Sequence, residues 1–499
     1  MQEPLLEQTK KNASVGKEDA EVCKRIAEEG IMEFKIKIED LSFGAGNAEQ
    51  ESEILEKAFV ETAEFKDILT GRFNVVIGNK GAGKSALYDA LIRARKPNVF
   101  IVPISSMTGT VEYERIFNRE NLAEMDTDNF REYWKRYIAL RTAYAIKNYQ
   151  AKGEASSEFD ELETEFEKMG FSKTLMIKAG MIAPEISEET FRMLLEIIRD
   201  ATVDYSKLLS LTDRLAKKWG IQIWFVMDRL DEIVISNSSA QKKAVEALFV
   251  TLKDLSVYKN LKPIIFLRED IYNNLEYAHV DHFHSVTRNI RWDREQLLLM
   301  LVKRILSLSE INSEEIEQDS AEDTFFKVFE NKIPNSRAGN CFDWMCNHLM
   351  DGRDITLPRD LILLANKSRD DQASKKYNVS TGEIISGKAI VKAHTNVAEI
   401  KLKDTERIYP EIKELIPSFS NELVKEEYGW IKRKSFQELF KDRDEKEIEN
   451  IIKRLIDSGF IRPENRTNPL SSPRFEIPYV YKTALGIKST GRKAQHKAE

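Results

Sequence analysis

The sequence predicts an α/β fold with a parallel central sheet, followed by a helical lid and a small C-terminal domain. Apolar runs of strand length alternate with helical segments up to about residue 292, and a glycine-rich turn links the first run to a helix. After residue 386 the pattern changes to helices followed by two short strands. A chain of 499 residues is long enough for about two to four domains.

Composition favours a globular protein of the cytoplasm. Hydrophobic residues make up 42% of the chain and charged residues 32%, and no apolar run approaches the roughly 18 residues that a membrane span needs. The three cysteines are too few for a disulfide framework, so we expect a reducing compartment and no membrane partner. The net charge is −7, but residues 401–499 carry +4, so only this part could favour a polyanion such as DNA.

The functional interpretation depends on the turn at residues 78–85. It matches G-x-x-x-x-G-K-[ST] and lies between an apolar run and a helical pattern, as a phosphate-binding loop requires. Its glycines let backbone N–H groups converge on an anion, Lys84 reaches the β- and γ-phosphates, and Ser85 binds Mg²⁺. An ordinary glycine-rich strand-to-helix turn is the alternative. The residues expected to bind the nucleotide are Gly78, Asn79, Lys80, Gly81, Ala82, Gly83, Lys84, Ser85 and Ala86.

A helical insertion is expected within the nucleotide-binding unit. The helix after the phosphate loop should end near Arg95, and residues 99–104 are typical of a second buried strand. From about residue 107 to 220, aromatic and aliphatic residues recur at helical spacing. We interpret the aromatic residues as core packing, with a base-stacking platform as the alternative.

A third apolar run, residues 221–227, ends at Asp228. Parallel strands bring their C-terminal ends to one edge of a sheet, so Asp228 is predicted to position Mg²⁺ beside Ser85. An acidic helix cap after the strand is the alternative.

Two arginines are candidate sensors of a γ-phosphate. Arg268 follows a fourth strand, residues 262–267, at the same edge. A salt bridge from Arg268 to Glu269 or Asp270 is the alternative.

The second candidate, Arg359, lies in the first turn of a helix that begins at Pro358. The helix dipole disfavours a cation there, so we expect an external anion as its partner. A local ion pair with Asp360 or Asp354 is the alternative.

The C-terminal region is predicted to form a winged helix. Helical patterns cover residues 390–412, 436–440 and 445–458, and residues 460–462 and 475–481 are typical of two strands. The outward face of the last helix mixes basic and acidic side chains, which favours packing against protein over DNA contact and leaves both open. The predicted segments are a leader (1–40), a nucleotide-binding core (41–292), a helical lid (293–367), a linker (368–386), the winged helix (387–487) and a basic tail (488–499).

Together these features resemble bacterial P-loop ATPases of the STAND and related AAA-like kind. The phosphate loop, the acidic strand end at residues 228–232, Arg268, Arg359 and the winged helix carry the resemblance, which covers about residues 41–487. It implies a P-loop NTPase sheet of the ASCE type with strand order 5-1-4-3-2, ATP with Mg²⁺, and Arg268 and Arg359 as first and second sensor. It also implies a homo-oligomer and a place in antiviral (anti-phage) defence or DNA maintenance.

One position departs from the pattern of these ATPases. The residue directly after the Mg²⁺-positioning aspartate is usually acidic and serves as the base for water, but here it is Arg229. Asp231 or Glu232 could take over, with Glu232 favoured, or hydrolysis could be slow. A neighbouring subunit could also donate Arg288 or Arg291.

The leading functional hypothesis is an ATP-driven switch in which the winged helix moves relative to the core and hydrolysis resets it. One alternative is a nucleotide-binding scaffold without turnover that regulates an effector protein, which Arg229 favours. Another is a small-molecule kinase, in which the helical insertion, Arg359 and the winged helix would have no role.

Overall fold

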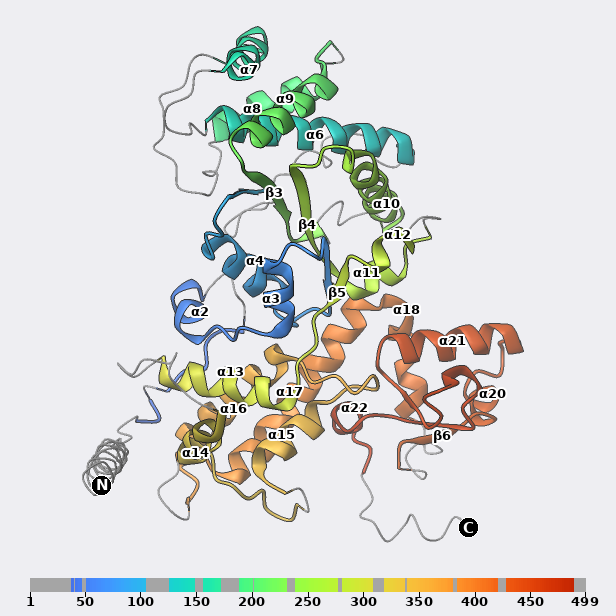
Figure 1. Cartoon of the computed structure of the whole chain (residues 1–499). Coiled ribbons are helices and arrows are strands. Elements are labelled where there is room, and N and C mark those ends of the chain that lie inside the picture. Colours follow the sequence, from blue (N-terminus) through green and yellow to red (C-terminus); the bar gives the residue numbers. More distant parts are fainter. Residues whose placement is uncertain are drawn as a thin grey trace, which may run out of the picture.

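The central element of the computed structural model is a five-stranded parallel sheet (Figure 1). The structure describes residues 37–39, 41–46, 51–104, 125–148, 156–171, 188–200, 202–230, 238–276, 281–307, 318–336, 339–379, 384–420 and 428–488. The strands are β1 (Val75–Gly78), β2 (Val99–Pro103), β3 (Gln222–Met227), β4 (Leu261–Arg268) and β5 (Thr287–Asn289). Their order, β2-β3-β4-β1-β5, confirms the expected order 5-1-4-3-2.

The register of the sheet brings the functional strand ends together. Gly78 at the end of β1 pairs with Arg268 at the end of β4, and Met227 at the end of β3 pairs with Ile265 of β4. All of β1 is buried, and so is β3 after its first residue, as expected for a sheet covered on both faces. The residues that follow these three strands therefore lie at one edge.

Helices cover both faces of the sheet (Figure 1). On one face α6, α9 and α10 share a core with alternate strand residues such as Val75 and Phe225. On the other face α3 and α4 pack with Val76 and Trp224. The helices of this region are α2 (Ser52–Ala58), α3 (Ala63–Leu69), α4 (Lys84–Arg93), α6 (Thr127–Lys147), α7 (Ser157–Lys168), α8 (Glu188–Ile198), α9 (Tyr205–Lys218), α10 (Ser238–Leu255), α11 (Glu269–Asn273) and α12 (Asp281–His284).

The aromatic residues of α6 pack in the core. Phe130, Trp134 and Tyr137 are at most 2% exposed. Trp134 Nε1 also donates a hydrogen bond to Ala244 O of α10 at 2.8 Å. In the described part of the insertion, these contacts confirm core packing over a base-stacking platform.

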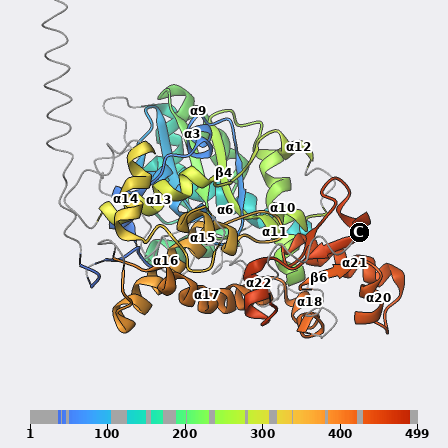
Figure 2. The same cartoon turned by 90° about the horizontal axis from the view of Figure 1, so that it is seen from below.

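The lid has a hydrophobic core of its own. Its helices are α13 (Arg294–Leu306), α14 (Gln318–Val328), α15 (Cys341–Leu349) and α16 (Pro358–Lys375). The first half of α17 (Gly387–Ile408) joins this core and packs along α16 (Figure 2). The linker predicted from residue 368 is wrong in its first part, because α16 continues to Lys375. Its polar residues have buried partners there: Gln372 Oε1 accepts a hydrogen bond from Ser386 Oγ at 2.7 Å.

The C-terminal domain combines helices with an antiparallel three-stranded sheet of order β6-β8-β7. The strand predicted at residues 475–481 ends at Glu476, because Pro478 lacks an N–H for the ladder and α22 begins at Tyr479. The elements are α18 (Pro410–Lys413), η4 (Ile416–Ser420), β6 (Trp430–Lys432), α20 (Ser435–Leu439), α21 (Glu445–Asp457), β7 (Arg462–Pro463), η5 (Pro469–Ser471), β8 (Arg474–Glu476) and α22 (Tyr479–Ala484). The assignment of this domain as a winged helix stays a prediction.

Among the described residues, no helix combines the length and the hydropathy that crossing a bilayer would need.

Candidate functional site

The phosphate loop joins β1 to α4 as the sequence predicts. Gly81 and Gly83 adopt left-handed backbone conformations, with φ of +87° and +95°. Space is also limited, since a Cβ added at Gly81 would lie 2.9 Å from Arg359 Cβ. Glycine is therefore required at Gly81 for both its backbone angle and its contact with the lid.

Lys84 folds back over the loop at the start of α4. Its ammonium donates hydrogen bonds to the carbonyl oxygens of Gly78 and Asn79, both at 3.1 Å. The loop thus holds a positive charge at the place where its backbone N–H groups converge. A phosphate would compete with these carbonyls for the ammonium.

Ser85 and Asp228 meet, as predicted for a shared magnesium site. Ser85 Oγ donates a hydrogen bond to Asp228 Oδ2 at 2.7 Å, and Asp228 is only 2% exposed. A hydroxyl and a carboxylate are hard oxygen donors of the kind that Mg²⁺ prefers when phosphate oxygens and water complete its shell. The pair therefore fits the implied ion.

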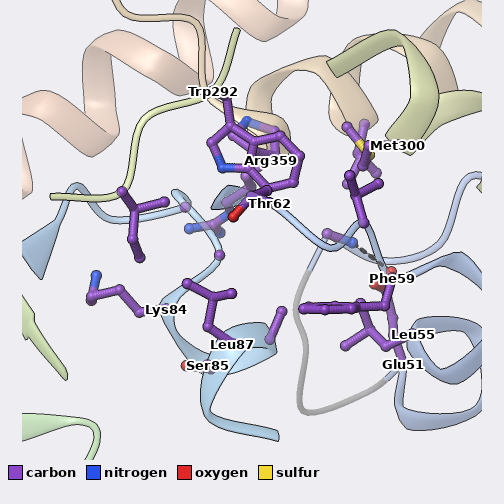
Figure 3. Close-up of a pocket in the computed structure, with 18 of the residues that line it drawn as sticks. Glu51, Leu55, Phe59, Thr62, Lys84, Ser85, Leu87, Trp292, Met300 and Arg359 are labelled. Atoms are coloured by element: carbon purple, nitrogen blue, oxygen red, sulfur yellow. Dashed lines mark hydrogen bonds between the residues drawn. The ribbon is translucent and has the colours of Figure 1, made fainter. Parts of the chain in front are cut away.

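Arg359 lies over the phosphate loop from the lid side (Figure 3). Its backbone N–H donates to Gly81 O at 3.4 Å, and its side chain packs on Gly81. Asp360 pairs with Lys401, and Asp354 pairs with Arg462 and Arg466. Among the described residues, the Arg359 guanidinium forms no ion pair, so the external anion remains its expected partner.

Arg268 is bound to a neighbouring carboxylate. Its Nη2 and Nε donate to the two carboxylate oxygens of Asp270 at 2.7 and 3.0 Å. The salt bridge from Arg268 to Asp270, which was the alternative to a sensor role, is thus present. Arg268 still lines the same cavity as the phosphate loop. A sensor role would require a phosphate to share or displace Asp270.

These residues line one end of a cavity of about 360 Å³ (Figure 3). Lys84 and Ser85 lie at that end, and a wall of apolar side chains from α2, the α2–α3 connection and the lid lines the other. The apolar residues are Leu55, Ala58, Phe59, Val60, Met300 and Ile362. The size and the two-sided character of the cavity suit a nucleotide, with its phosphates on the loop and its base on the apolar wall.

Trp292 is a site residue that the sequence reasoning missed. Its indole Nε1 donates to Ala82 O of the phosphate loop at 2.8 Å, and its ring lines the cavity. It lies three residues after the end of β5, on the side of the sheet edge that carries the phosphate loop. A strand-end position could have marked Trp292, but β5 is only three polar residues long and has no apolar run that predicts a strand.

A buried ion pair closes the apolar end of the cavity. Arg304 Nη2 of α13 lies 2.9 Å from Glu51 Oε2, and the two side chains are 6% and 2% exposed. Glu51 Oε1 also accepts from Gly46 N at 2.8 Å, and Arg304 Nη1 donates to Phe43 O at 2.7 Å. The pair ties the segment before α2 to the lid.

The Glu269 carboxylate accepts hydrogen bonds from three side chains near the phosphate loop. It accepts from Asn289 Nδ2 at 2.9 Å, from Arg291 Nη2 at 2.7 Å and from Arg353 Nη1 at 3.4 Å. Burial alone would raise the pKa of Glu269, but the hydrogen bonds from Arg291 and Asn289 and the charges of Arg291 and Arg353 lower it overall. Arg353 also donates to Asn79 Oδ1 at 2.9 Å.

The candidate bases Asp231 and Glu232 lie outside the described residues. Arg229 has a left-handed φ of +60° and lines the cavity. The two arginines considered as donors to a neighbouring subunit are paired within the chain. Arg288 lies 3.2 Å from Asp67, and Arg291 lies 2.7 Å from Glu269.

No protein-family model matches the chain. The "Putative transposon gamma-delta 80.3 kDa protein" of Escherichia coli (strain K12) is 24% identical over 456 residues, which cover 86% of this chain and 61% of that protein. The chain therefore spans about three fifths of this curated relative.

Solved structures show likenesses of low score. A Walker-type ATPase of Pyrococcus abyssi has a TM-score of 0.41 and 10% identity, over 86% of this chain and 96% of that one. The Aeropyrum pernix ORC2 protein, in ADPNP–ADP complexes, has a TM-score of 0.39 and 12% identity, over 85% and 90%. The fold assignment accordingly follows from the chain itself. Its strand order and its phosphate loop after β1 are those of an α/β P-loop NTPase.

Proposed function

We propose that this protein is a Mg²⁺-dependent ATPase that works as a nucleotide-driven switch. The observation that carries the proposal is the contact of Ser85 with Asp228 inside a cavity with a phosphate loop at one end and an apolar wall at the other. P-loop enzymes use these parts to hold a magnesium nucleotide.

In the proposed binding step, the N–H groups of residues 78–86 and Lys84 hold the phosphates. Lys84 exchanges its two loop carbonyls for phosphate oxygens. Ser85 and Asp228 would hold Mg²⁺, which supplies neutralisation of charge on the phosphates. Arg359 reaches the γ-phosphate from the lid, and Arg268 does so when a phosphate oxygen shares its guanidinium with Asp270.

For hydrolysis, a carboxylate must accept the proton of the attacking water. We propose Glu232 for this role, with Asp231 as the alternative, because Arg229 occupies the position directly after Asp228. ADP and phosphate are the products, and their release would return the C-terminal domain to its starting position relative to the core.

The apolar end of the cavity favours ATP over GTP. Recognition of guanine commonly needs a carboxylate that accepts from its ring and amino N–H groups. Glu51 is a carboxylate of the lining, but it is already bound to Arg304 and to Gly46 N. We therefore propose adenine as the preferred base.

A nucleotide-binding scaffold without turnover is the second candidate. Arg229 at the usual position of the base and the bidentate pair of Arg268 with Asp270 favour it. Such a scaffold would regulate an effector protein by its nucleotide-bound shape. A small-molecule kinase gives no role to the lid arginine or the C-terminal domain and is the weakest candidate.

We further propose a cytoplasmic homo-oligomer that acts in antiviral defence or in a DNA-associated system, with an effector protein as partner. This setting rests on the resemblance to STAND and AAA-like ATPases, and on a relative whose name associates it with a transposon. The C-terminal domain is the proposed contact for protein or DNA, as a winged helix.

Phosphate release from Mg-ATP tests the proposal. Lys84→Ala, Asp228→Asn and Glu232→Gln should each reduce turnover by roughly 100-fold or more relative to the wild type. The exposed Lys66→Ala on α3 serves as the matched lysine control and should keep wild-type turnover. Equal rates in all five proteins would contradict the ATPase. Mg-ATP binding without any phosphate release in the wild type would favour the scaffold.

A further inference from the structure

The loop between α15 and α16, residues 351–354, contacts the phosphate loop on one side. Arg353 Nη2 donates to Asn79 Oδ1 at 2.9 Å, and Arg353 Nη1 lies 3.4 Å from Glu269 Oε2. Asn79 belongs to the phosphate loop, and Glu269 directly follows the candidate sensor Arg268. One guanidinium therefore touches two elements that hold phosphate in the proposed function.

The same loop contacts the C-terminal domain on its other side. Gly352 N donates to Gly459 O at 2.7 Å, just after α21. Asp354 forms ion pairs with Arg462 at 3.0 Å and with Arg466 at 2.8 Å. These contacts reach the end of α21, strand β7 and the connection after it.

The 351–354 loop is built as a stiff unit. Asp351 Oδ1 accepts from the backbone N–H groups of Arg353 and Ile355, at 2.8 and 3.1 Å, and Asp351 Oδ2 pairs with the Arg353 guanidinium at 3.1 Å. The loop packs tightly against the C-terminal domain, because a Cβ added at Gly352 would lie 2.3 Å from Ile461 O. A displacement of Arg353 should therefore move the loop and its C-terminal partners together.

On the phosphate-loop side, by contrast, there is an unused hydrogen-bond donor and a small cavity. Asn79 is 8% exposed, and its Nδ2 is buried without a hydrogen-bond partner among the described residues. A cavity of about 40 Å³ adjoins it, lined by Asn79 and Arg353 and, from the C-terminal half, by Tyr409 and Ser458. The Asn79 amide can thus gain a partner or turn, and either change alters its bond to Arg353.

We infer that the 351–354 loop couples the nucleotide state of the phosphate loop to the C-terminal domain, with Arg353 as a positioning residue on the core side and Asp354 as the contact on the other. The inference rests on the proposed function, because it takes the phosphate loop as the nucleotide site. In the proposed switch, a change at Asn79 or Glu269 shifts Arg353. The 351–354 loop then shifts residues 459–466.

Hydrogen exchange of the full chain, with and without saturating Mg-ATPγS, tests this route. In the wild type, ligand should change backbone protection in the phosphate loop and in residues 459–466. Arg353→Gln should keep the change in the phosphate loop and lose the change in residues 459–466. Arg294→Gln is the matched control: it removes a lid ion pair with Asp343 that does not involve the 351–354 loop, and it should respond as the wild type does.

Asp354→Asn tests the coupling from the other side. Coupling is reciprocal, so weakening the C-terminal contacts should change the Kd of ATPγS by roughly fivefold or more. If Arg353→Gln shows no folded state in a thermal melt, Asp354→Asn and Arg353→Lys take its place in the hydrogen-exchange test.

Two failures are distinguishable. No ATPγS binding by the wild type would overturn the proposed function. Binding without a change in residues 459–466, or a full change there in Arg353→Gln, would overturn the coupling and leave the nucleotide site intact.

Discussion

Ser85 Oγ donates a hydrogen bond to Asp228 Oδ2 at 2.7 Å, although the two residues are 143 positions apart in the chain. The contact exists because β1 and β3 are parallel strands of one sheet and end at the same edge. It places a hydroxyl and a carboxylate where the phosphate loop and the lid enclose a cavity. The nucleotide proposal begins from this pair.

Phe59 tests where the base of the nucleotide lies. It belongs to the apolar wall, so Phe59→Ala should raise the Kd of Mg-ATP by roughly 10- to 100-fold through lost apolar burial. Binding of inorganic triphosphate, which has no base, should not change. Titration calorimetry with both ligands measures this, and the exposed Val257→Ala serves as control. An equal loss for both ligands would place the base elsewhere.

The Glu51–Arg304 pair tests how the lid is attached. Arg304→Met would leave a buried carboxylate unpaired and should lower the free energy of unfolding by about 3–5 kcal/mol. Arg294→Met removes a half-exposed pair with Asp343 and should change it by less than about 1 kcal/mol. Urea unfolding followed by tryptophan fluorescence compares them. Similar values for the two variants would show that the buried pair does not hold the lid.

Glu269 should make stability depend on pH in the acid range. Despite burial, its pKa lies below the ordinary value of 4.5, so the folded state binds its proton less readily than the unfolded state. The stabilisation by Glu269 is therefore present above about pH 4.5 and lost as the pH falls through the lower, folded-state pKa.

Urea unfolding of the wild type and Glu269→Gln between pH 3 and 7 measures this dependence. The difference in unfolding free energy should be constant from about pH 6 to 7 and should shrink below about pH 4.5. A difference that grows on acidification would mean that the pKa of Glu269 is raised instead.

The parts of the site that the sequence predicted are those marked by local pattern. The glycine spacing of the phosphate loop, the apolar run before Asp228 and the proline before Arg359 each identify a residue from its own neighbours. The sheet rule then places the phosphate loop and Asp228 together, because the C-terminal ends of parallel strands meet at one edge. It does not place Arg359, which lies on the lid helix α16. These predictions needed no knowledge of the other contacts.

Arg353 and Glu51 could not be found in this way. Arg353 and its partner Asn79 are 274 positions apart in the chain, and Arg304 and Glu51 are 253 apart. Nothing in the sequence around these residues indicates the partner. Composition also misled at Tyr479, where aromatic and β-branched residues favour a strand but Pro478 precedes a helix. Tertiary contacts, which no local pattern records, decided these cases.

Binding of Mn²⁺ as a substitute for Mg²⁺, followed by electron paramagnetic resonance, tests the central claim most directly. The account predicts tight Mn²⁺ binding to the wild type only when ATP is present, and a loss of roughly tenfold or more in both Ser85→Ala and Asp228→Asn. Mn²⁺–ATP affinity that is unchanged in both variants would contradict it.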